Sequence, residues 1–166
     1  MRQLKQGLPA IFLGVVVVLS LLMVILVLPF LLAGSWLWGR WLQARYRAKW
    51  SKDGKPLLFV YSKSPNWQHY IEEQWLPQLQ AHSVLLNWSE RETWARQSPF
   101  EAHVFHYFAG REEFNPIALY FPRHGPMRIV RFWQAFRDFK HGKERALKEA
   151  ERELFEILAQ LREGEV

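Results

Sequence analysis

The first quarter of the chain carries a long apolar stretch without the alternation of an amphipathic helix. No charged residue lies between Gln6 and Gly39, and residues 8–28 are mainly Leu, Val, Ile, Phe and Met. A helix of ~20 such residues crosses the hydrocarbon core of a bilayer and satisfies its own backbone hydrogen bonds there. A surface helix of a soluble domain would instead show a polar face. The pattern therefore predicts one N-terminal transmembrane helix.

Two features near the end of this stretch bear on where the helix stops. Pro29 is expected to kink or end the helix, because proline lacks a backbone N–H. Ala33, Gly34 and Ser35 form a small-residue cluster of the kind that signal peptidase accepts, which leaves a cleaved signal peptide as an alternative. The apolar core of a signal peptide is only ~7–15 residues long, however. We therefore divide this part into a tail (1–7), a transmembrane helix with an interfacial extension (8–38) and a basic juxtamembrane linker (39–55).

Aromatic and basic residues alternate after the apolar stretch. Indole rings favour the headgroup region, and Lys and Arg side chains reach anionic lipid from nearby positions. The predicted membrane-interface set is Trp36, Trp38, Arg40, Trp41, Arg45, Arg47, Lys49 and Trp50. The alternative is a single long, tilted span with a snorkelling end. More Lys and Arg follow the helix than precede it, so we expect an inner- or plasma-membrane anchor with the C-terminal domain in the cytoplasm.

The pattern changes at residue 56, where a domain of alternating strands and helices begins. The continuous apolar run 57–61 predicts a buried strand. Apolar residues then recur at helical spacing over 67–79, where Pro77 should kink or end the helix. A second buried run follows at 83–88. A strand, a helical crossover and another strand predict a parallel βαβ unit.

The second half of the domain predicts further strands and two helices. Residues 90–97 form a short helix or loop, and the aromatic segment 102–108 is expected to be a strand. Residues 116–121 and 127–132 should form the two arms of a hairpin. Helices are predicted over 133–141 and 143–162, and the second of these has a clear apolar stripe. The fold class is therefore α/β, with a mixed sheet of four to five strands and a C-terminal amphipathic helix.

This order of elements resembles the thioredoxin-like fold superfamily over roughly residues 56–160. The loop 62–67 leaves the first strand and enters a helix, as the redox loop does in that family. Pro77 lies inside this helix, further along than the family norm. Asn115 and Pro116 precede a strand and hairpin, where the family typically places a cis-proline that faces the redox loop. The resemblance implies that these two loops meet and form a binding surface.

The chain departs from that family at the redox motif itself. Ser64, Pro65, Asn66 and Trp67 stand where the family has its two cysteines, and the whole chain contains no cysteine. Thiol–disulfide exchange, disulfides and thiolate metal sites are thereby excluded. What the resemblance leaves is a binding platform made of Ser64, Trp67 and the backbone around Asn115 and Pro116.

The net charge of +6 does not predict a nucleic-acid partner, because of where the charge lies. Residues 1–55 hold eight Lys and Arg against one Asp, whereas residues 56–166 hold fourteen Lys and Arg against fifteen Asp and Glu. A nucleic-acid-binding domain carries its cations on the binding surface itself. We therefore expect the lipid bilayer and another protein or membrane complex as partners, and no nucleic acid.

Motifs for catalysis or metal binding are missing from the sequence. His103 and His106 form the one close histidine pair. They would face opposite sides in a strand, whereas in a helix their spacing would suit two ligands. No HExxH, P-loop, G-x-G-x-x-G or G-x-S-x-G motif occurs. We expect no catalytic residues, no cofactor and no metal site.

These observations predict a single-pass, non-catalytic protein-binding or scaffolding domain, an accessory subunit of a membrane-associated complex. Tryptophan is enriched at binding interfaces, and five of the nine tryptophans lie in the domain. The predicted partner surface is Ser64, Asn66, Trp67, Asn115, Pro116, Arg131 and Trp133. One alternative is a membrane-tethered enzyme that uses His103, His106 or Glu113. The other is a lipid-surface module that uses the basic and aromatic residues after the helix.

Overall fold

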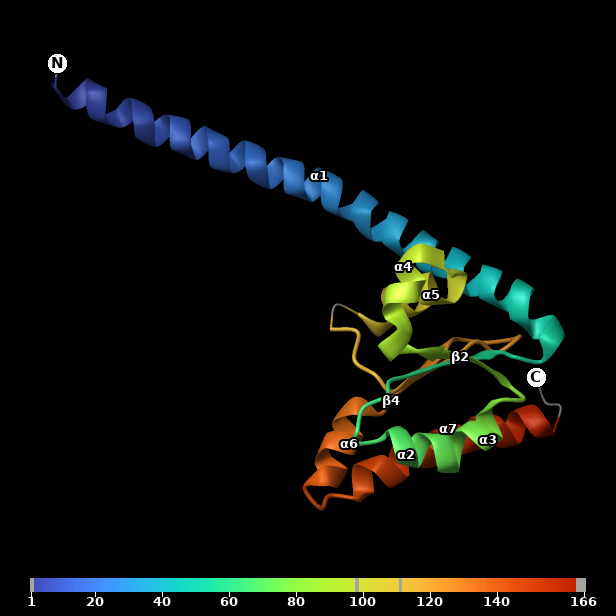
Figure 1. Cartoon of the computed structure of the whole chain (residues 1–166). Coiled ribbons are helices and arrows are strands. Elements are labelled where there is room, and N and C mark those ends of the chain that lie inside the picture. Colours follow the sequence, from blue (N-terminus) through green and yellow to red (C-terminus); the bar gives the residue numbers. More distant parts are fainter. Residues whose placement is uncertain (1, 98, 111, 164–166) are drawn as a thin grey trace. The chain divides into compact units, whose positions relative to one another are not determined.

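The structure is a computed structural model that describes residues 2–97, 99–110 and 112–163, with side chains from Phe12 onward apart from that of Ala95. The chain divides into two units, Met1–Arg40 and Trp41–Val166. A single helix, α1 (Arg2–Trp50), makes up the first unit and contributes its last turns to the second. Figure 1 labels the elements along the chain.

The first unit is a helix with exposed apolar side chains. Within the described residues, one segment, Phe12–Asp53, is long and apolar enough to cross a membrane; its mean hydropathy reaches 3.3, and none of that apolar window is buried. Leu26 and Phe30 of this helix are 66% and 78% exposed. The helix continues through Pro29, so this proline does not end it.

The second unit contains a four-stranded mixed sheet. Its strands are β1 (Leu57–Tyr61), β2 (Ser83–Asn87), β3 (Ile117–Tyr120) and β4 (Arg128–Arg131). They lie in the order β2-β1-β3-β4. β1 pairs parallel with β2 and antiparallel with β3, and β3 pairs antiparallel with β4. The predicted parallel unit and hairpin are therefore confirmed, and the sheet has four strands.

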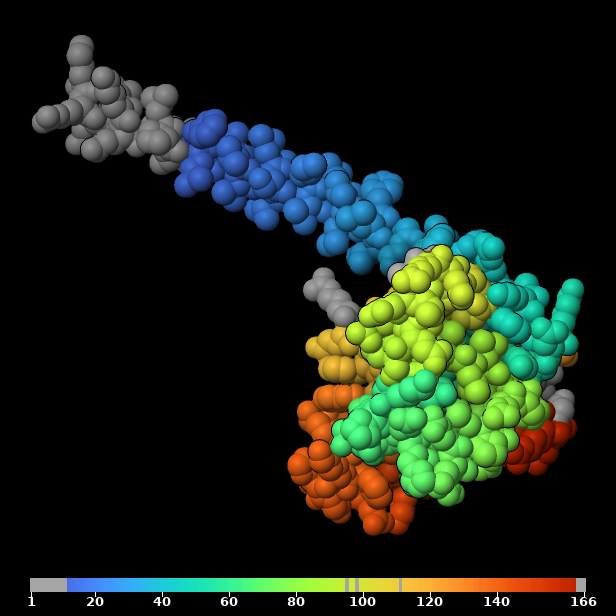
Figure 2. Space-filling view, in the orientation of Figure 1, coloured from blue at the N-terminus to red at the C-terminus, as the bar shows by residue number. Residues whose placement is uncertain are grey.

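Helices cover both faces of this sheet, which explains why its strands are continuously apolar. On one face lie α4 (Arg91–Gln97), α5 (Phe100–Ala109) and the last turns of α1. On the other lie α2 (Gln68–Tyr70), α3 (Leu76–Leu79), α6 (Trp133–Lys140) and α7 (Arg145–Arg162). Side chains close the gaps between the ribbons of Figure 1, as the space-filling view shows (Figure 2).

Alternate strand residues build two separate cores. Leu57 and Phe59 of β1 pack against the α2–α3–α6–α7 face with Trp75, whereas Leu58 and Val60 pack on the α5 face. The Trp75 indole N–H donates to Glu151 of α7 at 3.1 Å, so the larger core also holds its buried polar group in a hydrogen bond. Both cores are needed to order the sheet, because each strand contributes to both.

One of the predicted strands is wrong. Residues 102–108 form part of helix α5 instead of a strand, because Ala102, Val104, Phe105 and Ala109 face the core at helical spacing. The crossover helix continues past Pro77 to Leu79, after a π-helical turn, Ile71–Trp75. Such a turn changes the hydrogen-bond register of the helix where the proline N–H is missing. This crossover helix begins at Gln68.

Candidate functional site

The pairing of the strands gathers four connecting segments at one end of the sheet. β1 and β2 end there, at Tyr61 and Asn87, while β3 begins at Ile117 and β4 ends at Arg131. We call this the exit end, and the opposite end, with Leu57, Ser83, Tyr120 and Arg128, the entry end. Ligands in α/β sheets bind outside the carboxyl ends of parallel strands, so the exit end is the first place to look for a site.

All residues of the predicted partner surface belong to segments at the exit end. They are Ser64, Asn66 and Trp67 after β1, Asn115 and Pro116 before β3, and Arg131 and Trp133 at the end of β4 and the start of α6. These segments lie far apart in the sequence and meet through the strand register alone. This proximity does not test the prediction that the residues form one binding surface.

The segment after β1 is a compact turn. The carbonyl of Ser64 accepts the backbone N–H groups of Trp67 and Gln68 at 3.2 and 2.8 Å, which starts the crossover helix. The Trp67 ring packs against Phe136 of α6, with ring centroids 5.8 Å apart. Its indole N–H is buried and has no hydrogen-bond partner. A buried donor without an acceptor is costly. The Trp67 N–H is such a donor at the exit end.

The segment before β3 carries a second unmet group. Asn115 is 8% exposed and its side-chain oxygen has no partner. The Asn115–Pro116 peptide bond is cis, and the Pro116 carbonyl accepts the N–H of Phe132 at 3.0 Å. Pro116 is therefore tied to the end of β4, while the Asn115 amide is buried beside it without a partner for its oxygen.

The clearest exposed feature is an aromatic stack that the sequence analysis did not anticipate. Phe114 and Trp133 lie face to face, with ring centroids 4.1 Å apart and planes 4° from parallel. Phe114 is 39% exposed, and the Arg137 guanidinium lies 4.8 Å from the centre of the Trp133 ring. Trp133 was predicted; Phe114 and Arg137 were not, because neither belongs to a motif. Their sequence signal is an aromatic residue directly before Asn115 and a basic residue one helical turn after Trp133.

Arg131 has a structural role within this region. Its guanidinium donates to the carbonyls of Ala109 and Phe108 at the C-terminal end of α5, at 2.9 and 3.2 Å. A cation at the C-terminus of a helix is favourable, because carbonyl groups there lack partners. Arg131 therefore fastens β4 to α5, and part of its hydrogen-bonding capacity is already used.

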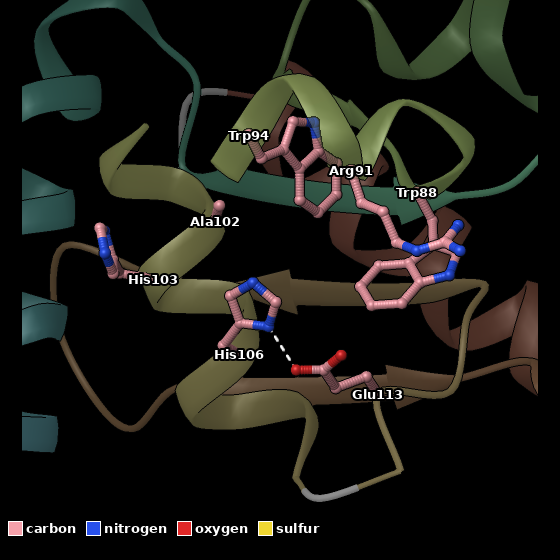
Figure 3. Close-up of a pocket in the computed structure, with 7 residues that line it drawn as sticks. All are labelled: Trp88, Arg91, Trp94, Ala102, His103, His106 and Glu113. Atoms are coloured by element: carbon pink, nitrogen blue, oxygen red, sulfur yellow. Dashed lines mark hydrogen bonds and ion pairs between the residues drawn. The ribbon is translucent and has the colours of Figure 1, made fainter. Parts of the chain in front are cut away.

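A pocket of about 480 Å³ lies beside this surface, between α4 and α5. It is lined by Trp88, Arg91, Trp94, Ala102, His103, His106 and Glu113, as Figure 3 shows. The rings of Trp88 and Trp94 meet edge to face, 5.8 Å apart, and each lies within 6.4 Å of the His106 ring. The pocket therefore combines apolar aromatic walls with a few polar groups, as ligand sites commonly do.

His106 and Glu113 are in contact across this pocket. The Glu113 carboxylate meets Nδ1 of His106 (Figure 3). A carboxylate can only accept, so Nδ1 carries the hydrogen and Nε2 of the neutral ring is left with a lone pair. Figure 3 shows this second nitrogen on the far side of the ring from Glu113. An imidazole oriented by a carboxylate is the arrangement of a general base.

Glu113 makes this contact from an unusual backbone conformation. Its φ is 47°, the only positive φ of a non-glycine residue in the part of the chain that the structure describes. Residues other than glycine rarely adopt this backbone conformation, and those that do are concentrated at functional sites. His103 also lines the pocket, on the same face of α5 as His106. The helix therefore brings together the two histidines that a strand would have separated.

Part of the predicted membrane-interface set contacts the domain. Lys49 Nζ and the Trp50 indole N–H both donate to Glu101 of α5, at 2.7 and 2.6 Å. Burial by itself would raise the pKa of Glu101, but these hydrogen bonds outweigh it and hold the pKa below its usual value. Arg47 donates to the Gly125 carbonyl at 3.0 Å, and Arg45 lies 5.3 Å from the Phe100 ring centre. These four residues thus join α1 to the domain.

The remaining members of that set are exposed on α1. Trp36, Trp38 and Trp41 are 64%, 51% and 42% exposed. The Arg40 guanidinium lies 6.0 Å from the Trp36 ring centre, within the first unit. Aromatic and basic residues on a highly apolar helix are typical of a membrane interface.

No group of three or more His, Asp or Glu side chains in the described part of the chain could hold a metal ion. Comparison of the chain with protein-family models, with curated proteins and with solved structures finds no match.

Proposed function

We propose that the chain is a single-pass membrane protein whose thioredoxin-like, cysteine-free domain binds another protein through the exit end of its sheet. In this proposal the domain is an accessory or scaffolding subunit of a membrane-associated complex, and α1 holds it at the bilayer. The observation that carries the proposal is the exposed Phe114–Trp133 stack with Arg137, next to two buried polar atoms that lack partners.

The strand order supports the thioredoxin-like part of the proposal. A parallel β1–β2 pair, an antiparallel β3–β4 hairpin and helices on both faces follow the order on which the resemblance rests. The cis Asn115–Pro116 bond lies directly before β3, where the family places its cis-proline. Ser64 stands in place of a redox cysteine, so the surface would serve binding and not thiol exchange.

The chemistry of the exit end supports a protein partner. Tryptophan and arginine are the residues that most often dominate interface energies, particularly where they are fixed in place before binding. Trp133 is fixed by its stack on Phe114 and by Arg137. Beside it, the Trp67 N–H and the Asn115 side-chain oxygen are buried without partners.

The apolar surface of α1 supports membrane anchoring. Its exposed side chains would aggregate in water but are matched to lipid. Fractionation of native membranes tests this part separately: the full-length chain should resist extraction by alkaline carbonate and require detergent. Recovery of the full-length chain in the soluble fraction would contradict the anchor.

Photo-cross-linking tests the binding surface in native membranes. Benzoylphenylalanine would replace Phe114 in one variant and Phe139 in another, since both are exposed phenylalanines, at 39% and 40%. We expect one discrete protein adduct from position 114 and none from position 139. The adduct should disappear when Trp133→Ala is added. Equal adducts from both positions, or none from position 114, would contradict the proposed surface.

A second function is favoured by the His106–Glu113 contact. In this alternative the pocket between α4 and α5 binds a small molecule and His106 acts as a general base. The test incubates a cellular metabolite extract with the purified full-length protein and follows its composition by mass spectrometry. A metabolite consumed by the wild type but not by His106→Ala would support an enzyme.

The matched control is His69→Ala. His69 also faces a glutamate, Glu73 at 3.2 Å, but it is 84% exposed on α2, away from the pocket. Unchanged extract composition with wild type and both variants would count against catalysis in the pocket.

A further inference from the structure

A second pocket, at the entry end of the sheet, differs from the exit-end pocket in its charge. It has a volume of about 280 Å³ and is lined by Tyr120, Pro122, Arg123, His124, Pro126, Arg128 and Gln160. The side chains of Arg123 and Arg128 are positively charged, and that of His124 can become so by binding a proton. Tyr120 and Gln160 each have a polar hydrogen to donate. No Asp or Glu is among the lining residues. The pocket therefore gathers positively charged and hydrogen-bond-donating side chains without a carboxylate to balance them.

Arg128 is the central group of this pocket. Its Nε and Nη2 atoms are buried and have no hydrogen-bond partner, and it takes part in no ion pair within the described residues. Arginine stays charged at all accessible pH values. Burying charged donors without an acceptor is unfavourable, so an anion in the pocket would remove a cost that the chain now bears.

The surroundings hold Arg128 in position for such an anion. Its guanidinium lies 5.4 Å from the Tyr120 ring centre, which fixes the plane of the fork. Burial raises the pKa of Tyr120, with the nearby Arg128 opposing the shift, so the phenol remains protonated and able to donate. Arg123 and His124 lie in the β3–β4 loop, whose Gly125 carbonyl accepts from Arg47. The loop is thereby anchored to the end of α1.

Phosphate is the oxyanion best suited to these groups. A guanidinium binds two phosphate oxygens in parallel, and the third and fourth oxygens can accept from the flanking side chains. We propose that the entry-end pocket, centred on Arg128 with Arg123, His124 and Gln160, is a binding site for a phosphate group. The group belongs either to dissolved phosphate or to a phosphomonoester lipid headgroup, because both present at least three terminal oxygens. The site is independent of the partner surface at the exit end.

Nuclear magnetic resonance of the full-length protein in detergent micelles tests the site with inorganic phosphate. The Nε–H signals of arginine and the side-chain amide of Gln160 are followed during titration in a buffer free of other polyvalent anions. We expect saturable shifts of the Arg128 and Gln160 signals, with a dissociation constant on the order of 1 mM. Absence of any shift at phosphate concentrations well above this dissociation constant would overturn the proposal.

Two variants and one control identify the binding residues. Arg128→Gln should weaken phosphate binding at least about tenfold, and Arg123→Gln about threefold. Arg123 is exposed, so its replacement tests the site even where Arg128→Gln perturbs the fold. Arg96→Gln changes an exposed arginine of α4 and should leave the affinity unchanged. Equal affinity in wild type, Arg123→Gln and Arg128→Gln would overturn the assignment.

Nanodiscs distinguish the two sources of the phosphate. Discs of phosphatidylcholine with phosphatidic acid, without dissolved phosphate, are compared with discs of phosphatidylcholine alone. If the Arg128 signal shifts in discs with phosphatidic acid but not in discs of phosphatidylcholine alone, the lipid headgroup is a ligand. The same shift seen only after addition of dissolved phosphate would identify the free ion. Its absence under both conditions contradicts the site.

Discussion

The two ends of the β-sheet each carry an arginine of β4, and the two guanidinium groups differ in hydrogen bonding. At the exit end, Arg131 donates to the carbonyls of Phe108 and Ala109. The partly exposed Phe114–Trp133 stack lies at the same end. At the entry end, Arg128 has two buried N–H groups without an acceptor. The exit end therefore suits an apolar contact with a protein, and the entry end suits an anion.

This difference shows why counting charged residues is a poor guide to function. Arginine occurs at both ends, but its role depends on whether the surrounding chain already satisfies its donors. An arginine bonded to helix carbonyls stabilises the fold, whereas an arginine with buried donors that lack an acceptor carries a cost that a bound anion could offset. Variants at one end of the sheet, compared with control variants elsewhere, distinguish the two roles.

The largest effect is expected at the exit end, on partner binding. Trp133→Ala removes the ring that Phe114 and Arg137 hold in place, and it should lower the affinity for the cross-linked partner about 30-fold, or ~2 kcal/mol. Affinity would be measured by thermophoresis of the detergent-solubilised protein. The control is Phe139→Ala, which removes a phenylalanine of α6 that is as exposed as Phe114. It should have little effect on the affinity. Similar losses in both variants would mean that the stack is not an anchor.

Next in size is the loss of a buried carboxylate near the entry end. Glu101→Ala deprives Lys49 Nζ and the Trp50 N–H of their acceptor, and should lower the free energy of unfolding by about 2 kcal/mol. Glu90→Ala at the exit end is the matched control. Glu90 pairs with Lys63 at 3.2 Å, but both side chains are more than half exposed, so its loss should cost less than ~1 kcal/mol. Denaturant titration followed by tryptophan fluorescence measures both.

The same carboxylate predicts a dependence of stability on pH. The pKa of Glu101 is lower in the folded protein than its ordinary value of ~4.3. The unfolded chain therefore binds the proton more tightly, and the stabilisation is complete above the unfolded pKa and is lost as the pH falls through the folded pKa. Wild type should lose more stability than Glu101→Ala between about pH 5 and pH 3. Parallel acid-unfolding curves would contradict this.

The sequence was sufficient for most of the fold, for reasons visible in particular strands. The continuous apolar runs at β1 and β2 reflect burial on both faces, and the length of the crossover required a parallel pair. Helix α5 was predicted to be a strand because its apolar, aromatic-rich composition was given more weight than the spacing of its apolar residues. The exposed positions 103, 106 and 110 do recur at helical spacing, and this pattern was the better guide.

The candidate sites were predictable only in part, because most of their contacts join distant segments. The resemblance implied that the segments with Trp67 and Asn115 meet, whereas Trp133 was predicted only as a member of the partner surface. No local pattern could pair Lys49 with Glu101, 52 residues away, and the basic, aromatic sequence around Lys49 fits a membrane interface equally well. Arg128 stood out only as one of several arginines, since its lack of an acceptor is a property of the folded chain.

Phosphate should stabilise the protein through the entry end alone. At a phosphate concentration ten times the dissociation constant, ligand binding adds about 1.4 kcal/mol to the free energy of unfolding, which corresponds to a rise in Tm of roughly 5 °C for a domain of this size. Sodium chloride at equal ionic strength is the reference. Trp133→Ala should keep the rise and Arg128→Gln should lose it. A rise retained in Arg128→Gln would show that phosphate acts elsewhere.

The smallest effect concerns the strain held at the exit end. Glu113→Gly and Glu113→Ala both remove the carboxylate that contacts His106, so they differ mainly in how well the new residue accepts a φ of 47°. Glycine adopts this conformation freely, whereas alanine does not. We expect Glu113→Gly to be more stable than Glu113→Ala by about 1 kcal/mol, measured by denaturant titration. That difference is the backbone cost at Glu113, whose N–H donates to the Gly110 carbonyl at 3.2 Å while its carboxylate contacts His106. If the two variants are equally stable, the loop relaxes without strain, and the position of Glu113 no longer argues for a site in the pocket.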